Sequence, residues 1–288
     1  MKAAAMCEAS AMCQAPLHLA TVQGVPVIAL VNQKGGVGKT TATLGLASAA
    51  WARRVPCLVV DLDPQGNATT GLGVWDSATN VDAALAADRP GAARELAVLS
   101  SWQHDAGAAP RVMASTTALA ARERQLLSDP VGAQDRLRLA LSGCDGLVLI
   151  DCPPSLGLLT INALFAADKA LVVTEPSAWA SDGVSEIMGT IERVANRKPL
   201  GLQVAGVAVN RLARTRDSRY WHEQLVADHG ALMLPPVRLR AAVAEAAARS
   251  LPIHALPPRK GASEACAEFD KIYDLVIGSD ARATAGEE

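Results

Sequence analysis

The stretch VPVIALVNQKGGVGKTT (residues 25–41) joins a continuous apolar run to a glycine-rich loop, and it decides the fold. An apolar run bounded by turn residues is typical of a buried strand, and residues 39–52 are expected to form the helix that follows. Further buried strands are expected at 55–63, 146–151, 169–176 and 201–211, and helices at 118–127, 131–142, 156–168 and 182–196. Beyond residue 211 the chain is expected to be mostly helical, with prolines marking turns. Apolar strands that alternate with helices predict an α/β fold, in which helices cover both faces of a mostly parallel, twisted sheet.

The loop after the first strand departs from the phosphate-binding pattern G-x-x-x-x-G-K-[ST] at one position. Gln33 stands where the first glycine is expected, and a second lysine, Lys34, follows it. Small residues allow backbone N–H groups to surround phosphate oxygens, and the helix N-terminus adds favourable partial charge. Lys39 is placed to reach the β- and γ-phosphates of a nucleotide, and the Thr40 hydroxyl to bind Mg²⁺. The predicted loop contacts are Lys34, Gly35, Gly36, Val37, Gly38, Lys39, Thr40 and Thr41.

Two other predicted strands end in acidic residues. In a parallel sheet, ligands bind beyond the carboxyl ends of the strands, so these acids should lie beside the glycine-rich loop. Asp151 ends the strand at 146–151 and suits the role of holding Mg²⁺, through a water molecule. Asp61 and Asp63 end the strand at 55–63. The sequence therefore predicts a site for a nucleoside triphosphate and magnesium.

Length and composition favour one globular domain. The chain has 288 residues, of which 50% are hydrophobic and 19% charged. We expect a tail at 1–24, a P-loop domain at 25–277 and an acidic tail at 278–288, with Met1, Met6 or Met12 as the start. The six cysteines include no C-x-x-C pair and fit neither a disulfide framework nor a zinc site. No apolar stretch of membrane-spanning length or secretion signal is evident, so the cytoplasm is the expected location.

Charge is distributed unevenly along the chain. Residues 193–260 hold twelve Lys or Arg against four acidic residues, a net charge of +8, whereas the whole chain carries −2 and the remainder therefore −10. Such asymmetry points toward a polyanionic partner, although solvated arginines are the commoner cause of a basic segment.

Three motifs resemble those of a known family. KGGVGKTT (34–41), DLDPQGNATTGLG (61–73) and IDCPPSLGLLTINAL (150–164) are similar to the motifs of deviant-Walker ATPases of the ParA/Soj type. The resemblance extends through AVNR (208–211) and RLRAAVAEAAARSLPI (238–253) to PPRKGASEACAEF (257–269), and so covers residues 25–275. Residues 75–135 match poorly, and PPVRLRAAVAE differs from the family's common IPRNVRLSEAP.

The resemblance implies a role for each matching residue. Lys34 matches the signature lysine, which in this class crosses a dimer interface to the partner's nucleotide. Lys39 and Thr40 match the phosphate and magnesium ligands, Asp63 the acid that orients the attacking water, and Asp151 the magnesium-associated acid. Asn210 lies where family members contact adenine. The implied cofactors are ATP and Mg²⁺, and the catalytic set is Lys34, Lys39 and Asp63.

The resemblance also implies partners. An ATP-dependent homodimer would bind double-stranded DNA without sequence preference, and a ParB-like centromere-binding protein would stimulate hydrolysis, so that the protein is nucleoid-associated. Phosphate contacts of this kind are electrostatic and salt-dependent. The candidate DNA contacts are Arg214, Arg216, Arg219, Arg238, Arg240 and Arg259.

Other functions compete with DNA partitioning. A membrane-cycling ATPase like MinD is disfavoured, because the chain ends in the acidic GSDARATAGEE and not in a basic amphipathic helix. A redox ATPase like the nitrogenase iron protein needs cluster-binding cysteines, and Cys152 has no evident second partner. An orphan relative that regulates transcription or positions another cargo stays open. A sequence-specific operator-binding domain is not expected, because only 24 residues precede the first strand.

Overall fold

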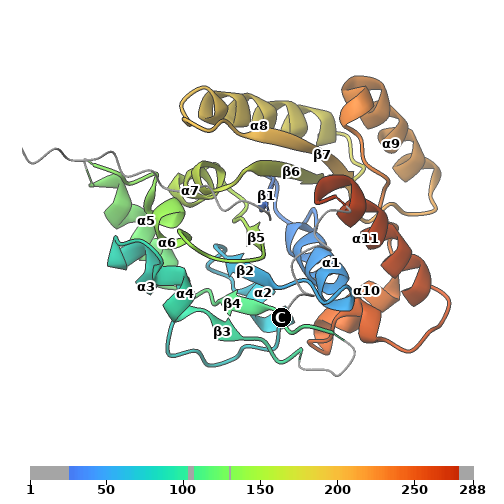
Figure 1. Ribbon diagram of the computed structural model, residues 1–288. Coiled ribbons are helices and arrows are strands. Elements are labelled where there is room, and N and C mark those ends of the chain that lie inside the picture. The colour runs from blue at the N-terminus through green and yellow to red at the C-terminus, as the bar shows by residue number, and fades with distance from the viewer. Residues whose placement is uncertain (1–25, 103–106, 130, 279–288) are drawn as a thin grey trace, which may run out of the picture.

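The computed structural model of the chain describes residues 26–102, 107–129 and 131–278. These residues form one α/β domain around a seven-stranded sheet with the order β3-β4-β2-β5-β1-β6-β7 (Figure 1). The strands are β1 (Val27–Val31), β2 (Cys57–Asp61), β3 (Val98–Leu99), β4 (Arg111–Met113), β5 (Leu147–Asp151), β6 (Lys169–Thr174) and β7 (Gln203–Val209). All neighbouring pairs are parallel except β3 and β4, so the predicted fold class is confirmed.

The helices form two layers. One layer packs with the cluster that includes Val31, Val60 and Ile150, and contains α3 (Val81–Ala87), α4 (Ala92–Leu96), α5 (Leu119–Leu127), α6 (Arg136–Ala140), α7 (Leu158–Ala166), α8 (Ala180–Ala195) and α9 (Arg216–His229). The other packs with Ile28 and Val59, and contains α1 (Lys39–Ala52), α2 (Asn67–Gly71), α10 (Ala241–Ala248) and α11 (Ala262–Val276). Short 3₁₀ turns lie at η1 (Gly230–Leu232) and η2 (Ile253–Ala255). Alternate residues of each strand thus feed opposite cores, which explains the continuous apolar runs.

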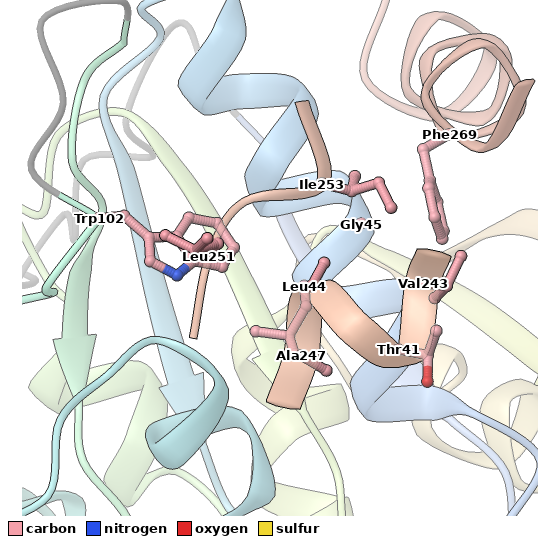
Figure 2. A pocket seen from close by; sticks show the side chains of 10 residues that line it. Thr41, Leu44, Gly45, Trp102, Val243, Ala247, Leu251, Ile253 and Phe269 are labelled. Carbon is pink, nitrogen blue, oxygen red and sulfur yellow. The ribbon is translucent and has the colours of Figure 1, made fainter. Parts of the chain in front are cut away.

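Helix α1 is buried on nearly all sides, because α11, α10 and η2 pack over its outer surface (Figure 1). A Cβ atom on Gly45 would lie 2.2 Å from a ring carbon of Phe269, so the glycine allows the close approach of α1 and α11. A small apolar cavity of about 20 Å³ remains between α1, α10, η2 and α11 (Figure 2). The helix that begins at the glycine-rich loop is therefore held firmly on the domain.

The sequence predictions were wrong in one helix and incomplete between residues 64 and 117. The helix expected at 131–142 is limited to Arg136–Ala140, because Gly132 has a left-handed backbone (φ 78°) and a turn precedes the helix. The short strands β3 and β4 and the helices α2, α3 and α4 lie in the stretch that was assigned no elements. The expected tail at 1–24, and residues 279–288 of the expected C-terminal tail, lie outside the described residues. Within the described part, no helix is long and apolar enough to cross a membrane.

Candidate nucleotide site

The glycine-rich loop connects the end of β1 to the first turn of α1. Gly36 and Gly38 have left-handed backbones (φ 78° and 92°), a conformation that residues with a Cβ atom rarely adopt. Val37 between them is fully buried, so its side chain packs into the domain. The loop is therefore shaped by backbone geometry, as an anion-binding turn before a helix requires.

Two buried asparagines hold this loop in place. Asn32 accepts a hydrogen bond from the Lys34 N–H (2.9 Å) and donates one to the Val173 carbonyl (2.7 Å). Asn210, at the end of β7, donates to the Gly38 carbonyl (3.2 Å). Sequence reasoning missed Asn32, although its place at the end of a strand was a usable signal. For Asn210, which the resemblance links to adenine, the structure shows a contact with the loop itself.

Lys39 and Thr40 begin α1 at the floor of the site. The Lys39 ammonium donates to the Asn32 carbonyl (3.0 Å) and to the Lys34 carbonyl (3.3 Å). Burial lowers the pKa of Lys39, and the charge of Asp151 acts in the opposite direction. The Thr40 hydroxyl donates to Asp151 Oδ2 (2.7 Å), so the residue pair predicted for magnesium is brought together from two elements. Thr43, not predicted, donates to the other Asp151 oxygen (3.2 Å).

Asp151 and Asp61 are register partners on neighbouring strands and are both buried. Burial, together with the Asp61 carboxylate, raises the pKa of Asp151 from 3.8 to about 7. Burial also raises the pKa of Asp61 to about 6, against hydrogen bonds from Thr69 that favour the ionised form. Two carboxylates at this end of the sheet create a site that favours added positive charge.

Asp63 lies on the loop between β2 and α2 and lines the same cavity as the glycine loop. Its backbone N–H donates to Asp61 Oδ1 (3.1 Å), and its carbonyl accepts from the Ser115 hydroxyl. Asp61 Oδ2 accepts from both the N–H (2.8 Å) and the hydroxyl (2.7 Å) of Thr69. The Ser115 N–H in turn donates to the Thr69 hydroxyl (2.9 Å), which completes the network. Asp61 thus fixes the loop that carries Asp63.

Seven of the eleven predicted nucleotide-site residues line a solvent-open cavity of about 430 Å³. Its lining consists of Gly35, Gly36, Gly38, Lys39, Thr40, Thr41, Leu44, Asp63, Asn67, Thr70, Gly71, Pro154, Ala247 and Ala248. The other four predicted residues, Lys34, Val37, Asp151 and Asn210, are not among the described residues that line it. Cavities of this size hold small organic ligands.

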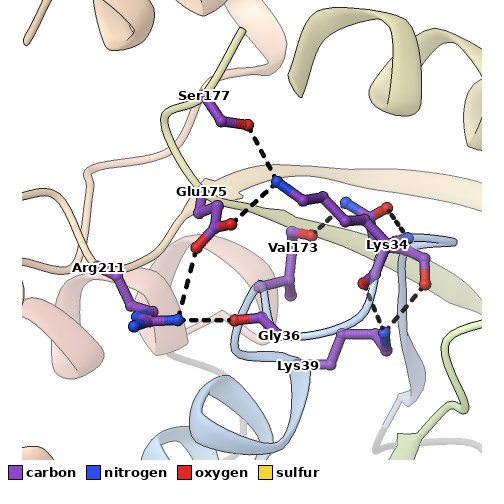
Figure 3. A network of polar contacts seen from close by, with 8 residues as sticks. Lys34, Gly36, Lys39, Val173, Glu175, Ser177 and Arg211 are labelled. Carbon is purple, nitrogen blue, oxygen red and sulfur yellow. Dashed lines mark hydrogen bonds and ion pairs between the residues drawn. The ribbon is translucent and has the colours of Figure 1, made fainter. Parts of the chain in front are cut away.

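The side chain of Lys34 points away from the rest of the phosphate loop and contacts residues that follow β6 (Figure 3). Its ammonium contacts Glu175 Oε1 (3.0 Å) and Ser177 Oγ (3.2 Å). Arg211 approaches the other oxygen of Glu175 (3.5 Å) and donates to the Gly36 carbonyl (3.0 Å). Sequence reasoning missed Glu175, although it follows an apolar strand as the other acids of the site do.

The candidate DNA-binding arginines fall into two groups. Arg214, Arg216 and Arg219 are exposed around the start of α9, and their side chains have no hydrogen-bond or ion-pair partner among the described residues. Two of the others are paired within the protein: Arg240 pairs with Glu268, and Arg259 pairs with Glu245. Arg238 donates only its backbone N–H to Glu268; its side chain is exposed and has no hydrogen-bond or ion-pair partner among the described residues, so it belongs with the first group. The arginines of this first group are the ones available to a polyanion.

The donor set at the loop fits magnesium bound to a phosphate ligand. Mg²⁺ prefers oxygen ligands and keeps several waters, so one hydroxyl and one carboxylate are sufficient protein groups. Thr40 and Asp151 supply these oxygens. The described residues contain no cluster of three or more His, Cys, Asp or Glu that could hold a metal ion by themselves.

Comparisons with known proteins agree with this geometry. Residues 25–204 match the family described as AAA domain. The chromosome partitioning protein ParA of Myxococcus xanthus is 38% identical over 186 residues, which are 63% of this chain and 63% of that protein, so the match spans less than two thirds of that relative. The sporulation initiation inhibitor protein Soj of Bacillus subtilis is 37% identical over 66% of this chain and 74% of its own length.

Solved structures show the same fold. Cobyrinic acid a,c-diamide synthase from Mycobacterium smegmatis, solved with an ATP analog and magnesium, has a TM-score of 0.70 at 29% identity, covering 87% of this chain and 93% of its own. A variant of McdA from Cyanothece, solved in complex with ATP, has a TM-score of 0.75 at 18% identity, covering 88% and 96%, and this likeness supports the fold alone.

Proposed function

Because the chain belongs to the ParA/Soj family of the ParA/MinD superfamily of P-loop ATPases, we propose that it is an ATP-dependent DNA-partitioning ATPase. Lys39 would contact the phosphates of ATP in the cavity at the glycine loop, and Thr40 and Asp151 would hold Mg²⁺ there. Bound magnesium would supply positive charge beside the γ-phosphate, Lys39 would add to it, and Asp63 would orient the attacking water.

The position of Lys34 carries the proposal. Its side chain is 44% exposed and turned away from the cavity of its own subunit, onto Glu175 and Ser177. A lysine so placed can reach the nucleotide of a second subunit, where it adds positive charge beside the γ-phosphate. ATP then favours the dimer by mass action, because only the dimer offers the second lysine. Hydrolysis removes that advantage and resets the protein.

Substitution of Lys34 tests this mechanism. Lys34→Ala should abolish dimerisation with ATP and Mg²⁺ in size-exclusion chromatography with light scattering, while the unfolding temperature without nucleotide stays the same. Lys271→Ala removes another exposed lysine, on α11, and serves as the matched control. A dimer that forms equally well without the Lys34 side chain would refute the mechanism.

DNA binding is assigned to Arg214, Arg216 and Arg219, whose guanidinium groups are free of partners in the described structure. Contacts with the DNA backbone should weaken steeply with salt. Charge reversal of all three should weaken binding of the ATP form equally across unrelated duplexes, whereas Arg124→Glu, an exposed arginine on α5, should not. Binding that ignores both salt and the triple reversal would refute the assignment. ATPase activity measured with and without DNA and a ParB-like protein tests the remaining partner and the nucleoid location that follows from it.

A further inference from the structure

Asn210 is the polar side chain through which β7 touches the glycine loop. It is 3% exposed and lies directly after the strand. Its Nδ2 donates to the Gly38 carbonyl (3.2 Å), and a Cβ atom added to Gly38 would lie 1.8 Å from that nitrogen. Side chain and loop are therefore in full contact, with no room for a larger residue at position 38.

The orientation of the Asn210 amide is fixed from the other end. Its Oδ1 accepts the Arg211 backbone N–H (2.8 Å), which requires Nδ2 to face Gly38. Arg211 itself has a left-handed backbone (φ 57°), which is uncommon for a residue with a side chain. Its guanidinium donates to the Gly36 carbonyl (3.0 Å). Consecutive residues at the end of β7 thus hold two carbonyls of the loop.

These carbonyls belong to the two glycines with positive φ. Holding the carbonyl oxygen of a peptide group also fixes the N–H on its other side, because the peptide group is planar. The N–H groups of the loop are the groups expected to surround phosphate oxygens. A side chain that anchors the carbonyls therefore preorganises the phosphate site without touching the ligand.

We propose that Asn210 is a positioning residue, which holds the glycine loop in the shape that binds phosphate, and that its amide does not select the base. The side chain has almost no exposed surface and is not among the described residues that line the cavity at the glycine loop, so it is poorly placed to recognise adenine. The inference rests on the proposed nucleotide site but not on DNA partitioning. It predicts that loss of Asn210 weakens every ligand bound through its phosphates, whatever its base.

The test compares ADP, GDP and inorganic tripolyphosphate, each with Mg²⁺, by isothermal titration calorimetry. Asn210→Ala should weaken all three by a similar factor of about tenfold, the order expected for one lost buried hydrogen bond and a looser loop. The ratio of ADP to GDP affinity should not change. A loss confined to ADP would overturn the proposal in favour of an adenine contact, and unchanged binding of all three would overturn it outright.

Asn162→Ala is the matched control. Asn162 is also a fully buried asparagine bonded to backbone groups, at Leu137, Ala133 and Leu158, but it lies on α7 and does not touch the loop. Asn162→Ala should lower thermal stability and leave the affinities for the three ligands unchanged. If Asn162→Ala also weakens the binding of all three ligands, the effect of Asn210→Ala is explained by general destabilisation, and the proposal is overturned. If Asn210→Ala does not fold, Asn210→Leu keeps the branched shape of the side chain and removes both hydrogen bonds, with the same expected outcomes. A wild-type chain that binds none of the ligands would refute the nucleotide site itself, which is a separate result.

Discussion

The substitution Asp151→Asn should stabilise the nucleotide-free protein while it removes ATP hydrolysis. Asp151 is 1% exposed, and its two oxygens accept hydrogen bonds from the Thr40 and Thr43 hydroxyls. An amide has nearly the same size, and the hydroxyl groups can rotate to meet its donor and acceptor ends. The main change is thus the loss of a buried negative charge beside Asp61.

The magnitude follows from the pKa of Asp151, which burial and the Asp61 charge raise from 3.8 to about 7. Each pKa unit corresponds to about 1.4 kcal/mol, so ionised Asp151 lowers the free energy of unfolding by about 4 kcal/mol above pH 7. The attraction to Lys39 is already part of this pKa, but the amide is itself a buried polar group and offsets part of the gain. We therefore expect a net gain of about 2 kcal/mol at pH 7.5.

The pH dependence has a definite sign. A carboxyl group whose pKa is raised by folding binds its proton more tightly in the folded state, so stability falls as pH rises from about 4 to about 7. The gain from Asp151→Asn should therefore be small near pH 5 and largest above pH 7. Urea unfolding at several pH values, in EDTA and without nucleotide, measures this difference directly.

The control is Asp145→Asn, which should change stability little at any pH. Asp145 is an exposed aspartate just before the first residue of β5, whereas Asp151 is the last residue of that strand. The reasoning is wrong if Asp151→Asn destabilises the protein, or if its effect does not vary between pH 5 and pH 8. Loss of hydrolysis with retained or improved stability would separate the proposed role of Asp151 in magnesium binding from any role in folding.

Three further substitutions test other contacts. Glu175→Gln should strengthen ATP-dependent dimerisation a few-fold, because it weakens the partly exposed ion pair with Lys34, which is worth about 0.2–1 kcal/mol in the monomer. An unchanged dimer dissociation constant, measured by light scattering, would show that the pair has no influence. Gly45→Ala should lower the free energy of unfolding by about 1–3 kcal/mol through overlap with the Phe269 ring, and equal or higher stability in urea would contradict this packing. Arg240→Ala should cost about 2 kcal/mol of stability, since it leaves a half-buried glutamate of α11 unpaired, with little effect on DNA affinity; the reverse pattern would make it a DNA contact.

The sequence was sufficient to predict the elements that obey simple periodicity. The strands at 146–151 and 169–176 lie within a few residues of the observed β5 and β6, because runs buried on both faces leave little ambiguity. The strands β3 and β4 have only two and three residues, and their pairing depends on neighbours distant in the sequence. No local pattern could have located them.

The same distinction applies to the site. The proximity of Lys39, Thr40 and Asp151 could be predicted, because phosphate and magnesium binding requires those residue types at strand and helix ends. The contact of Glu175 with Lys34 joins residues 141 positions apart in the sequence, and only the parallel pairing of β1 with β6 brings them together. The ion pairs of Arg240 and Arg259 could not be predicted either, because their partners Glu268 and Glu245 lie on separate helices, α11 and α10.

The carboxylate of Glu175 lies between two cations, Lys34 from the glycine loop and Arg211 from the turn after β7. In the proposed dimer, where Lys34 would contact the nucleotide of the other subunit, this carboxylate would be left to Arg211 alone. Arg211 precedes the segment that carries Arg214, Arg216 and Arg219. Loss of the Lys34 contact would therefore change the charge balance at the start of the segment proposed to bind DNA.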